Sequence, residues 1–140
     1  MIDSRTEFCT YVKNRIITKL TEAEEYELLC YALFGMGLLL RQSDILKLEW
    51  EQIDFSSGEV GDVYLTKLSN QKGIDMHSDY ILSEELINAL EKWYGKTPNK
   101  ELIFPNLKKY SSAKRIGEII GDICLSANEL RSIGIVLKSV

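Results

Sequence analysis

One stretch of the sequence decides the fold, and it reads Arg41-Gln42-Ser43-Asp44-Ile45-Leu46-Lys47-Leu48-Glu49-Trp50-Glu51-Gln52-Ile53-Asp54. A long apolar run, from Leu28 to Leu40, leads into it and ends at a cation. Ser43 is expected to cap a new helix, with Asp44 in the first turn, where the helix dipole favours a carboxylate. Arg41 is therefore predicted to lie in an elbow between two helices, from which an arginine can grip a phosphate.

The apolar residues of the same stretch predict how it packs. Ile45, Leu46 and Leu48 are expected to face a core, and Trp50 follows as a large apolar plug. A capped helix-turn-helix whose arginine pairs with a nearby carboxylate would have the same spacing, which is common in globular helices. The stretch alone therefore leaves a phosphate-binding and a structural interpretation of Arg41 open.

The stretch resembles the first signature box of the tyrosine recombinases, the phage integrase family. That box reads roughly Gly-Leu-Arg-x-Ser-Glu-(Ile/Leu)-Leu-x-Leu-x-Trp-x-Asp-Ile-Asp. The positions that follow it in register are Arg41, Ser43, Asp44, Ile45, Leu46, Leu48, Trp50, Ile53 and Asp54. Leu39 and Gln52 depart from it. The resemblance implies that Arg41 matches the family's first catalytic arginine, which clamps the scissile phosphate.

Length and composition are those of one ordinary soluble domain. The 140 residues are 45% apolar and 27% charged, and residues 1–140 are expected to form a single domain. No apolar run can cross a bilayer and no secretory signal is present, which predicts a cytoplasmic protein without a membrane partner. The three cysteines are expected to be reduced core thiols, and neither a metal site nor a cofactor is expected.

Charge is distributed unevenly along the chain. The net charge of −4 argues against strong nonspecific binding to nucleic acid. Residues 1–60 carry 6 cations and 11 anions (net −5), residues 61–100 carry 5 and 6 (net −1), and residues 101–140 carry 6 and 4 (net +2). A basic face could form in the C-terminal part, but a solvated helix surface explains its residues equally well: Lys108, Lys109, Lys114 and Arg115.

The rest of the sequence predicts an α+β fold that is mainly α-helical. Helices are expected over Ser4 to Ile17, from the capping box Thr21-Glu22-Ala23-Glu24 through the buried run, after Ser83, after Ser112, and after the capping box Ser126-Ala127-Asn128-Glu129. On the first helix, Phe8, Val12 and Ile16 are expected to form the buried face, with Tyr11 beside them. Extended segments over residues 60–65 and 74–82 predict a small antiparallel β-sheet of two to three strands.

The order of these elements is similar to the tyrosine recombinase catalytic domain, over Ser4 to Val140. In the family the sheet ends in a phrase like Val-Pro-Leu-Ser-x-Glu-Leu, and a Leu-Phe-Pro follows. Here the corresponding phrases are Tyr80-Ile81-Leu82-Ser83-Glu84-Glu85-Leu86 and Ile103-Phe104-Pro105. The resemblance implies an integrase-like catalytic domain core, expected here without the N-terminal core-binding domain of full-length recombinases.

The resemblance also implies roles for particular residues. In the family, two arginines and a lysine surround a phosphate, a histidine transfers protons and a tyrosine is the nucleophile. Lys72 matches the lysine of the sheet turn, with Lys67 as the runner-up, although either could be a solvated turn residue. Arg131 matches the second arginine, but Asn128 replaces the histidine of His-x-x-Arg and cannot shuttle protons near neutral pH. Arg131 could equally pair with a carboxylate on a neighbouring helix.

The nucleophile has no candidate in the sequence. None of the seven tyrosines, Tyr110 included, lies in the matching place before the chain stops at Val140. His77, the one histidine, falls in a predicted strand, where a structural role is the more common one. We therefore expect a domain truncated before the tyrosine segment, which does not cut or join DNA alone.

Three functions remain open. The first is a catalytically inactive, recombinase-like DNA-binding or regulatory protein of a phage or mobile element. It would bind DNA weakly to moderately through phosphate contacts from Arg41, Lys72, Arg131 and Lys67. The second is a protein-interaction module that pairs with a recombinase-like partner or self-associates without binding DNA. The third is a recombinase fragment completed in trans. The two arginines and the lysine favour the first function, and the net charge favours the second.

Overall fold

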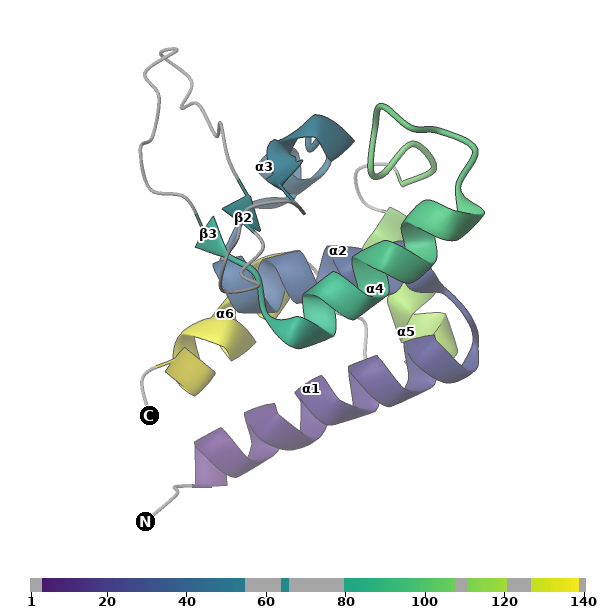
Figure 1. Cartoon of the computed structure of the whole chain (residues 1–140). Coiled ribbons are helices and arrows are strands. Elements are labelled where there is room, and N and C mark those ends of the chain that lie inside the picture. Colours follow the sequence, from purple (N-terminus) through teal and green to yellow (C-terminus); the bar gives the residue numbers. More distant parts are fainter. Residues whose placement is uncertain (1–3, 55–63, 66–79, 108–110, 121–126, 139–140) are drawn as a thin grey trace.

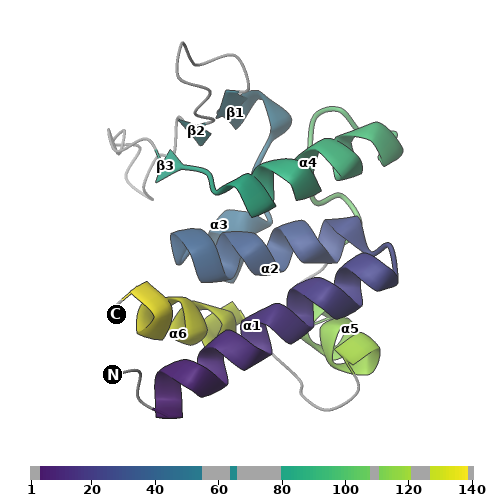
Figure 2. The ribbon, with the colours of Figure 1, turned by 60° about the horizontal axis from the view of Figure 1, so that its bottom comes forward.

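The computed structural model of the chain describes residues 4–54, 64–65, 80–107, 111–120 and 127–138. Its helices are α1 (Ser4–Glu22), α2 (Tyr26–Leu38), α3 (Gln42–Ile45), α4 (Glu84–Lys96), α5 (Ser111–Ile120) and α6 (Ala127–Lys138), with a 3-10 turn, η1 (Trp50–Gln52). α2 lies between α4 and α1, and α6 packs beside both α2 and α1 (Figures 1 and 2). The first turn of α1 and the last turn of α6 lie on the same side of the molecule. The prediction of a mainly helical fold is confirmed.

Three strands of two residues each pair in the order β1 (Ile53–Asp54), β2 (Tyr64–Leu65) and β3 (Tyr80–Ile81). Both pairings are antiparallel, and Leu65 is opposite Ile53 on one side and Tyr80 on the other. These six residues do not establish the predicted small sheet, because most of residues 60–65 and 74–82 lie outside the described residues. That part of the fold stays a prediction.

α1 is longer than predicted, and its buried face matches the predicted one only in part: Val12 and Ile16 are buried as expected. Phe8, which was expected on the buried face, is 60% exposed, and Tyr11 beside it is also exposed. The buried residues of α1 are Thr6, Cys9, Val12, Ile16 and Leu20. Burial of Leu20 continues the helix through Thr21, because most helical stability comes from tertiary packing of one face. The predicted capping box at Thr21 is therefore wrong, and α2 begins at Tyr26 without a side-chain cap.

α2 is the central buried helix, as the apolar run predicts. Its residues from Glu27 to Met36 are all buried. Phe104, from the phrase Ile103-Phe104-Pro105, lies edge-on to Tyr31 and Phe34, and its ring centroid is 6.2 Å and 5.9 Å from theirs. Cys30 is buried and free, and burial raises the pKa of its thiol well above the usual range. The thiol therefore stays protonated and packs as a small apolar group.

Glu27 is a buried carboxylate that ties a loop to α2. Its Oε2 accepts a hydrogen bond from the Asn106 backbone N–H at 3.1 Å, and its Oε1 accepts one from Asn106 Nδ2 at 3.2 Å. Burial raises the pKa of Glu27 above its ordinary value of 4.5, and the two hydrogen bonds from Asn106 act in the opposite direction. Burial has the larger effect, so the protonated form is favoured in the folded chain relative to the unfolded one.

Acidification is therefore expected to stabilise the folded chain, because it removes the unfavourable free energy of burying an ionised carboxylate at Glu27. A folded-state pKa above the unfolded value contributes stability that is complete below the unfolded pKa and is lost as the pH rises through the folded pKa. Relative to Glu27→Gln, the wild-type free energy of unfolding should rise as the pH falls from 7 toward 4.5, the ordinary pKa. Urea unfolding of both proteins across this range measures the difference. A difference that shrinks on acidification would contradict the raised pKa.

The predicted N-caps of the later helices have different outcomes. Ser83 caps α4 as predicted, because its Oγ accepts a hydrogen bond from the Leu86 N–H at 3.2 Å. Ser112 is not a cap, because α5 begins one residue earlier at Ser111. Ser126, the predicted cap of α6, lies outside the described residues. Of the helices that the structure describes, none combines the length and the apolar character needed to cross a membrane.

Candidate functional site

Arg41 lies in the elbow between α2 and α3. Its backbone is extended (φ −77°, ψ 155°), and its carbonyl oxygen accepts hydrogen bonds from the N–H groups of Asp44 and Ile45, each at 3.0 Å. The Arg41 side chain is exposed. Within the described residues, no ion pair or hydrogen bond involves its guanidinium, so the carboxylate partner of the structural interpretation is not among them. The guanidinium is accessible to a ligand from solvent.

The helix after Arg41 is shorter than predicted. α3 is a single turn, and its N-cap position is Arg41, not Ser43. The chain leaves the helix because the next segment pairs with the loop after α4: the Trp50 N–H donates to the Glu101 carbonyl at 2.8 Å, and the Ile103 N–H to the Leu48 carbonyl at 3.2 Å. A single turn carries little macrodipole. The elbow therefore offers an anion the charge of Arg41 rather than a helix N-terminus.

Arg131 comes from α6 and reaches the same elbow. Its Nε donates a hydrogen bond to the carbonyl oxygen of Leu39 at 2.9 Å. Leu39 is the C-cap of α2 and directly precedes Leu40 and Arg41. An arginine has five N–H donors, so the terminal amino groups of Arg131 remain to bind another acceptor. The side chain of Arg131 is thus tied to backbone two residues before Arg41, with no carboxylate partner among the described residues.

Leu39 supplies its carbonyl from a strained conformation. Its backbone is left-handed (φ 58°, ψ 31°), where a Cβ is disfavoured by about 1 kcal/mol and glycine is the usual residue. This is the position where the family's signature box has glycine. The departure at Leu39 therefore marks a turn that keeps its shape despite the larger side chain. The glycine of the box was the signal, in the sequence, that this backbone has a positive φ.

Gly134 allows α6 to approach α2 closely enough for this contact. A Cβ at residue 134 would lie 2.1 Å from the Met36 carbonyl oxygen and 2.6 Å from Leu39 Cδ2. One turn earlier on α6, the Leu130 Cβ lies 3.2 Å from the position of a Cβ on Gly35. The sequence analysis did not single out Gly134. Its signal was a glycine four residues after the buried Leu130, inside a helix where glycine is otherwise unfavourable.

The remaining predicted site residues are not placed by the structure. Asn128 belongs to the first turn of α6, but its side chain is not described. Lys72, Lys67 and His77 lie outside the described residues. Convergence of the arginines and Lys72 on one anion therefore stays a prediction. In the described part of the chain, no group of three His, Cys, Asp or Glu side chains could hold a metal ion.

Comparison with protein families matches this chain to the Phage integrase family over residues 11–129. The matched span includes the elbow at Arg41 and the whole of α2 to α5, and it ends just before Arg131. Comparison with curated proteins and with solved structures finds no match. Because the match covers most of the chain, this protein belongs to the phage integrase family of tyrosine recombinases.

Proposed function

We propose that this chain is a recombinase-like DNA-binding protein of a phage or mobile element that contacts DNA phosphates through Arg41 and Arg131. The observation that carries the proposal is the hydrogen bond from Arg131 Nε to the Leu39 carbonyl, which links α6 to the elbow of Arg41. Guanidinium groups present planar pairs of donors that match phosphate oxygens. Arg41 supplies an exposed group, and Arg131 supplies one that is already oriented.

The proposal extends to residues whose side chains are not described. Lys72, with Lys67 as the alternative, is proposed as a third phosphate-binding cation, and Asn128 as a neutral hydrogen-bonding group. Asn128 cannot take up or release a proton near neutral pH, whereas the family uses histidine at this position. We therefore propose that residues 1–140 hold DNA without cleaving it, which suits a regulatory role.

The test is DNA affinity in the double variant Arg41→Gln/Arg131→Gln. Glutamine removes the charge but keeps a polar side chain, so lost affinity reports the phosphate contacts. Fluorescence anisotropy with a labelled duplex should show binding that weakens with salt, and the double variant should bind about tenfold more weakly at low salt. The slope of log affinity against log salt should fall by about 2, one for each phosphate contact.

A charge-matched control separates a site from net charge. Arg5→Gln/Lys92→Gln also removes two cations, but from exposed positions on α1 and α4. Equal losses of affinity in the control and in the arginine pair would contradict the proposal. The single variant Arg41→Gln is a control for misfolding. No contact among the described residues involves this side chain, so the variant should fold as the wild type does and still bind DNA more weakly. Incubation with a nicked duplex should give no covalent protein–DNA adduct. An adduct would refute the proposal that the chain holds DNA without cleaving it.

A protein-interaction role without DNA binding is the second candidate. It is favoured by the net charge of −4 and by the exposed aromatic pair of α1, Phe8 and Tyr11, which are 60% and 58% exposed. Contiguous exposed apolar surface often marks an interaction site. This function predicts no DNA affinity at physiological salt and a sedimentation coefficient that rises with protein concentration.

A further inference from the structure

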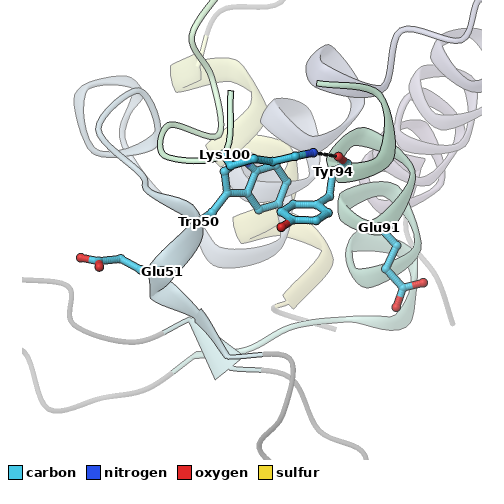
Figure 3. A pocket seen from close by; sticks show the side chains of 5 residues that line it. All are labelled: Trp50, Glu51, Glu91, Tyr94 and Lys100. Carbon is cyan, nitrogen blue, oxygen red and sulfur yellow. Dashed lines mark hydrogen bonds between the residues drawn. The ribbon is translucent and has the colours of Figure 1, made fainter. Parts of the chain in front are cut away.

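A shallow pocket of about 620 Å³ opens beside η1 and the second half of α4. It is lined by Trp50, Glu51, Glu91, Tyr94 and Lys100 (Figure 3). Its volume is within the range of small-ligand sites in proteins. Its lining combines two aromatic rings with charged side chains of both signs, which is a composition suited to a cationic group rather than to a purely apolar one.

The two aromatic rings form a fixed base for the pocket. Trp50 is 6% exposed, and its Nε1 donates a hydrogen bond to the Asn99 carbonyl at 3.2 Å. Tyr94 is 44% exposed and lies edge-to-face with Trp50, with centroids 5.0 Å apart and planes at 83°. The buried indole therefore holds the phenol ring in place while the phenol remains accessible from solvent.

Lys100 shows that the Tyr94 ring accommodates a cation. Its Nζ lies 4.0 Å from the ring centroid. The same ammonium donates hydrogen bonds to the carbonyl oxygens of Thr97, at 2.9 Å, and of Tyr94. These carbonyls belong to the C-terminal end of α4, whose partial negative charge offsets the lysine. Lys100 keeps its positive charge, but its ammonium is held against the end of α4 by these two carbonyl oxygens.

Two carboxylates give the pocket its net charge. Glu51 and Glu91 lie on opposite sides of the aromatic pair, at the rim of the pocket, and their carboxylates point outward into solvent (Figure 3). Both are exposed, and neither has a hydrogen bond or ion pair among the described residues. With Lys100 included, the lining side chains carry two negative charges and one positive charge, so the pocket has a formal net charge of −1. A phosphate backbone is repelled here, and a cationic side chain is attracted.

We propose that this pocket binds an arginine side chain of a partner protein. A guanidinium is planar and weakly hydrated, stacks on aromatic rings and pairs with carboxylates through two hydrogen bonds. The exposed Tyr94 ring, supported edge-to-face by the buried Trp50, is its platform, and Glu51 and Glu91 at the rim are its counter-charges. This inference is independent of the proposed DNA contacts at Arg41 and Arg131, because it concerns a different surface of opposite charge.

The test uses two small probes on the intact 140-residue chain: Nα-acetylarginine amide and the uncharged Nα-acetylcitrulline amide. Two-dimensional ¹H–¹⁵N spectra resolve the indole N–H of Trp50 from that of Trp93. The Trp93 indole is an internal control, because it donates to the Ile103 carbonyl at 2.7 Å and does not line the pocket. The arginine probe should shift the Trp50 signal saturably, and the citrulline probe should bind at least about fivefold more weakly. Equal binding of the two probes would overturn the proposal.

Charge-matched variants complete the test. Glu51→Gln/Glu91→Gln should weaken the arginine probe about fivefold without lowering DNA affinity, and Tyr94→Leu should weaken it further. Glu7→Gln/Glu118→Gln removes the same charge from exposed positions on α1 and α5 and should leave binding of the probe unchanged. An equal loss in this control would overturn the proposal. The other outcome is a wild-type dimer that Glu51→Gln/Glu91→Gln dissociates. This outcome would show that the pocket binds a second copy of the chain, and it would overturn the proposal of a different partner protein.

Discussion

Replacing Gly134 with alanine is expected to lower the free energy of unfolding by about 3 kcal/mol. The added Cβ would lie 2.1 Å from the Met36 carbonyl oxygen, which is backbone and cannot rotate away. α6 would have to move off the end of α2, although alanine favours a helix by about 1 kcal/mol over glycine. Urea unfolding monitored by circular dichroism measures the loss.

The matched control is Gly37→Ala, in the last turn of α2. A Cβ at residue 37 meets nothing within 4 Å, so this variant should be neutral or more stable by up to about 1 kcal/mol. Gly35→Ala should be intermediate, because its Cβ would lie 3.2 Å from the Leu130 Cβ. Equal stability of the alanine variants at 134 and 37 would show that α6 does not approach α2 so closely.

Gly134→Ala also links the fold to the proposed function. Arg131 and Gly134 lie on the same stretch of α6, so displacement of the helix carries Arg131 Nε away from the Leu39 carbonyl that it contacts at 2.9 Å. DNA affinity should therefore fall under conditions in which the variant is still folded, whereas Gly37→Ala should bind as the wild type does. A folded Gly134→Ala protein that binds DNA with wild-type affinity would show that the position of α6 does not matter for DNA binding.

The parts of the fold that sequence predicts well are those that depend on local pattern. A long apolar run predicts a buried helix, and α2 is buried; a serine before two glutamates predicts a cap, and Ser83 caps α4. One local pattern on α1 was misleading for a tertiary reason. Phe8, Val12, Ile16 and Leu20 recur every four residues, but packing against α2, α5 and α6 buries the last three and leaves Phe8 exposed.

The candidate site is predictable residue by residue but not as an arrangement. The signature box identifies Arg41, and the phrase after Asn128 identifies Arg131, because each motif is local. The contact between Arg131 and Leu39 depends on a positive φ at Leu39 and on a close helix crossing at Gly134. Neither follows from the spacing of charged residues. Ser43 was predicted as a cap because its preference is local, whereas the helical hydrogen bonds of α3 already begin at the Arg41 carbonyl, which accepts from the N–H groups of Asp44 and Ile45.

The signature box combines two charges of opposite sign. It begins with an exposed cation at Arg41 and ends beside an aromatic pocket flanked by carboxylates, with Trp50 as the buried link. A net charge of −4 is therefore compatible with phosphate binding, because binding depends on the local field at the elbow. The same acidity that disfavours nonspecific binding to DNA favours a basic protein partner at the pocket.

Trp50→Ala is expected to lower the free energy of unfolding by about 4 kcal/mol, whereas Phe8→Ala should change it by no more than about 0.5 kcal/mol. The two substitutions remove aromatic rings from opposite environments: Trp50 is 6% exposed and Phe8 is 60% exposed. Trp50 also donates its indole N–H to the Asn99 carbonyl, so its loss leaves a cavity and a broken contact to the loop after α4.

The cost of Phe8→Ala, compared with that of Ile16→Ala, decides whether Phe8 belongs to the buried face of α1. Thermal and urea unfolding of both variants give the two free energies, with Ile16→Ala as a positive control on α1, because Ile16 is fully buried. If Phe8→Ala were as costly as Ile16→Ala, Phe8 would be buried together with Val12 and Ile16, as the sequence alone predicts. The aromatic pair of Phe8 and Tyr11 would then be part of the core, and α1 would no longer offer an exposed surface to a protein partner.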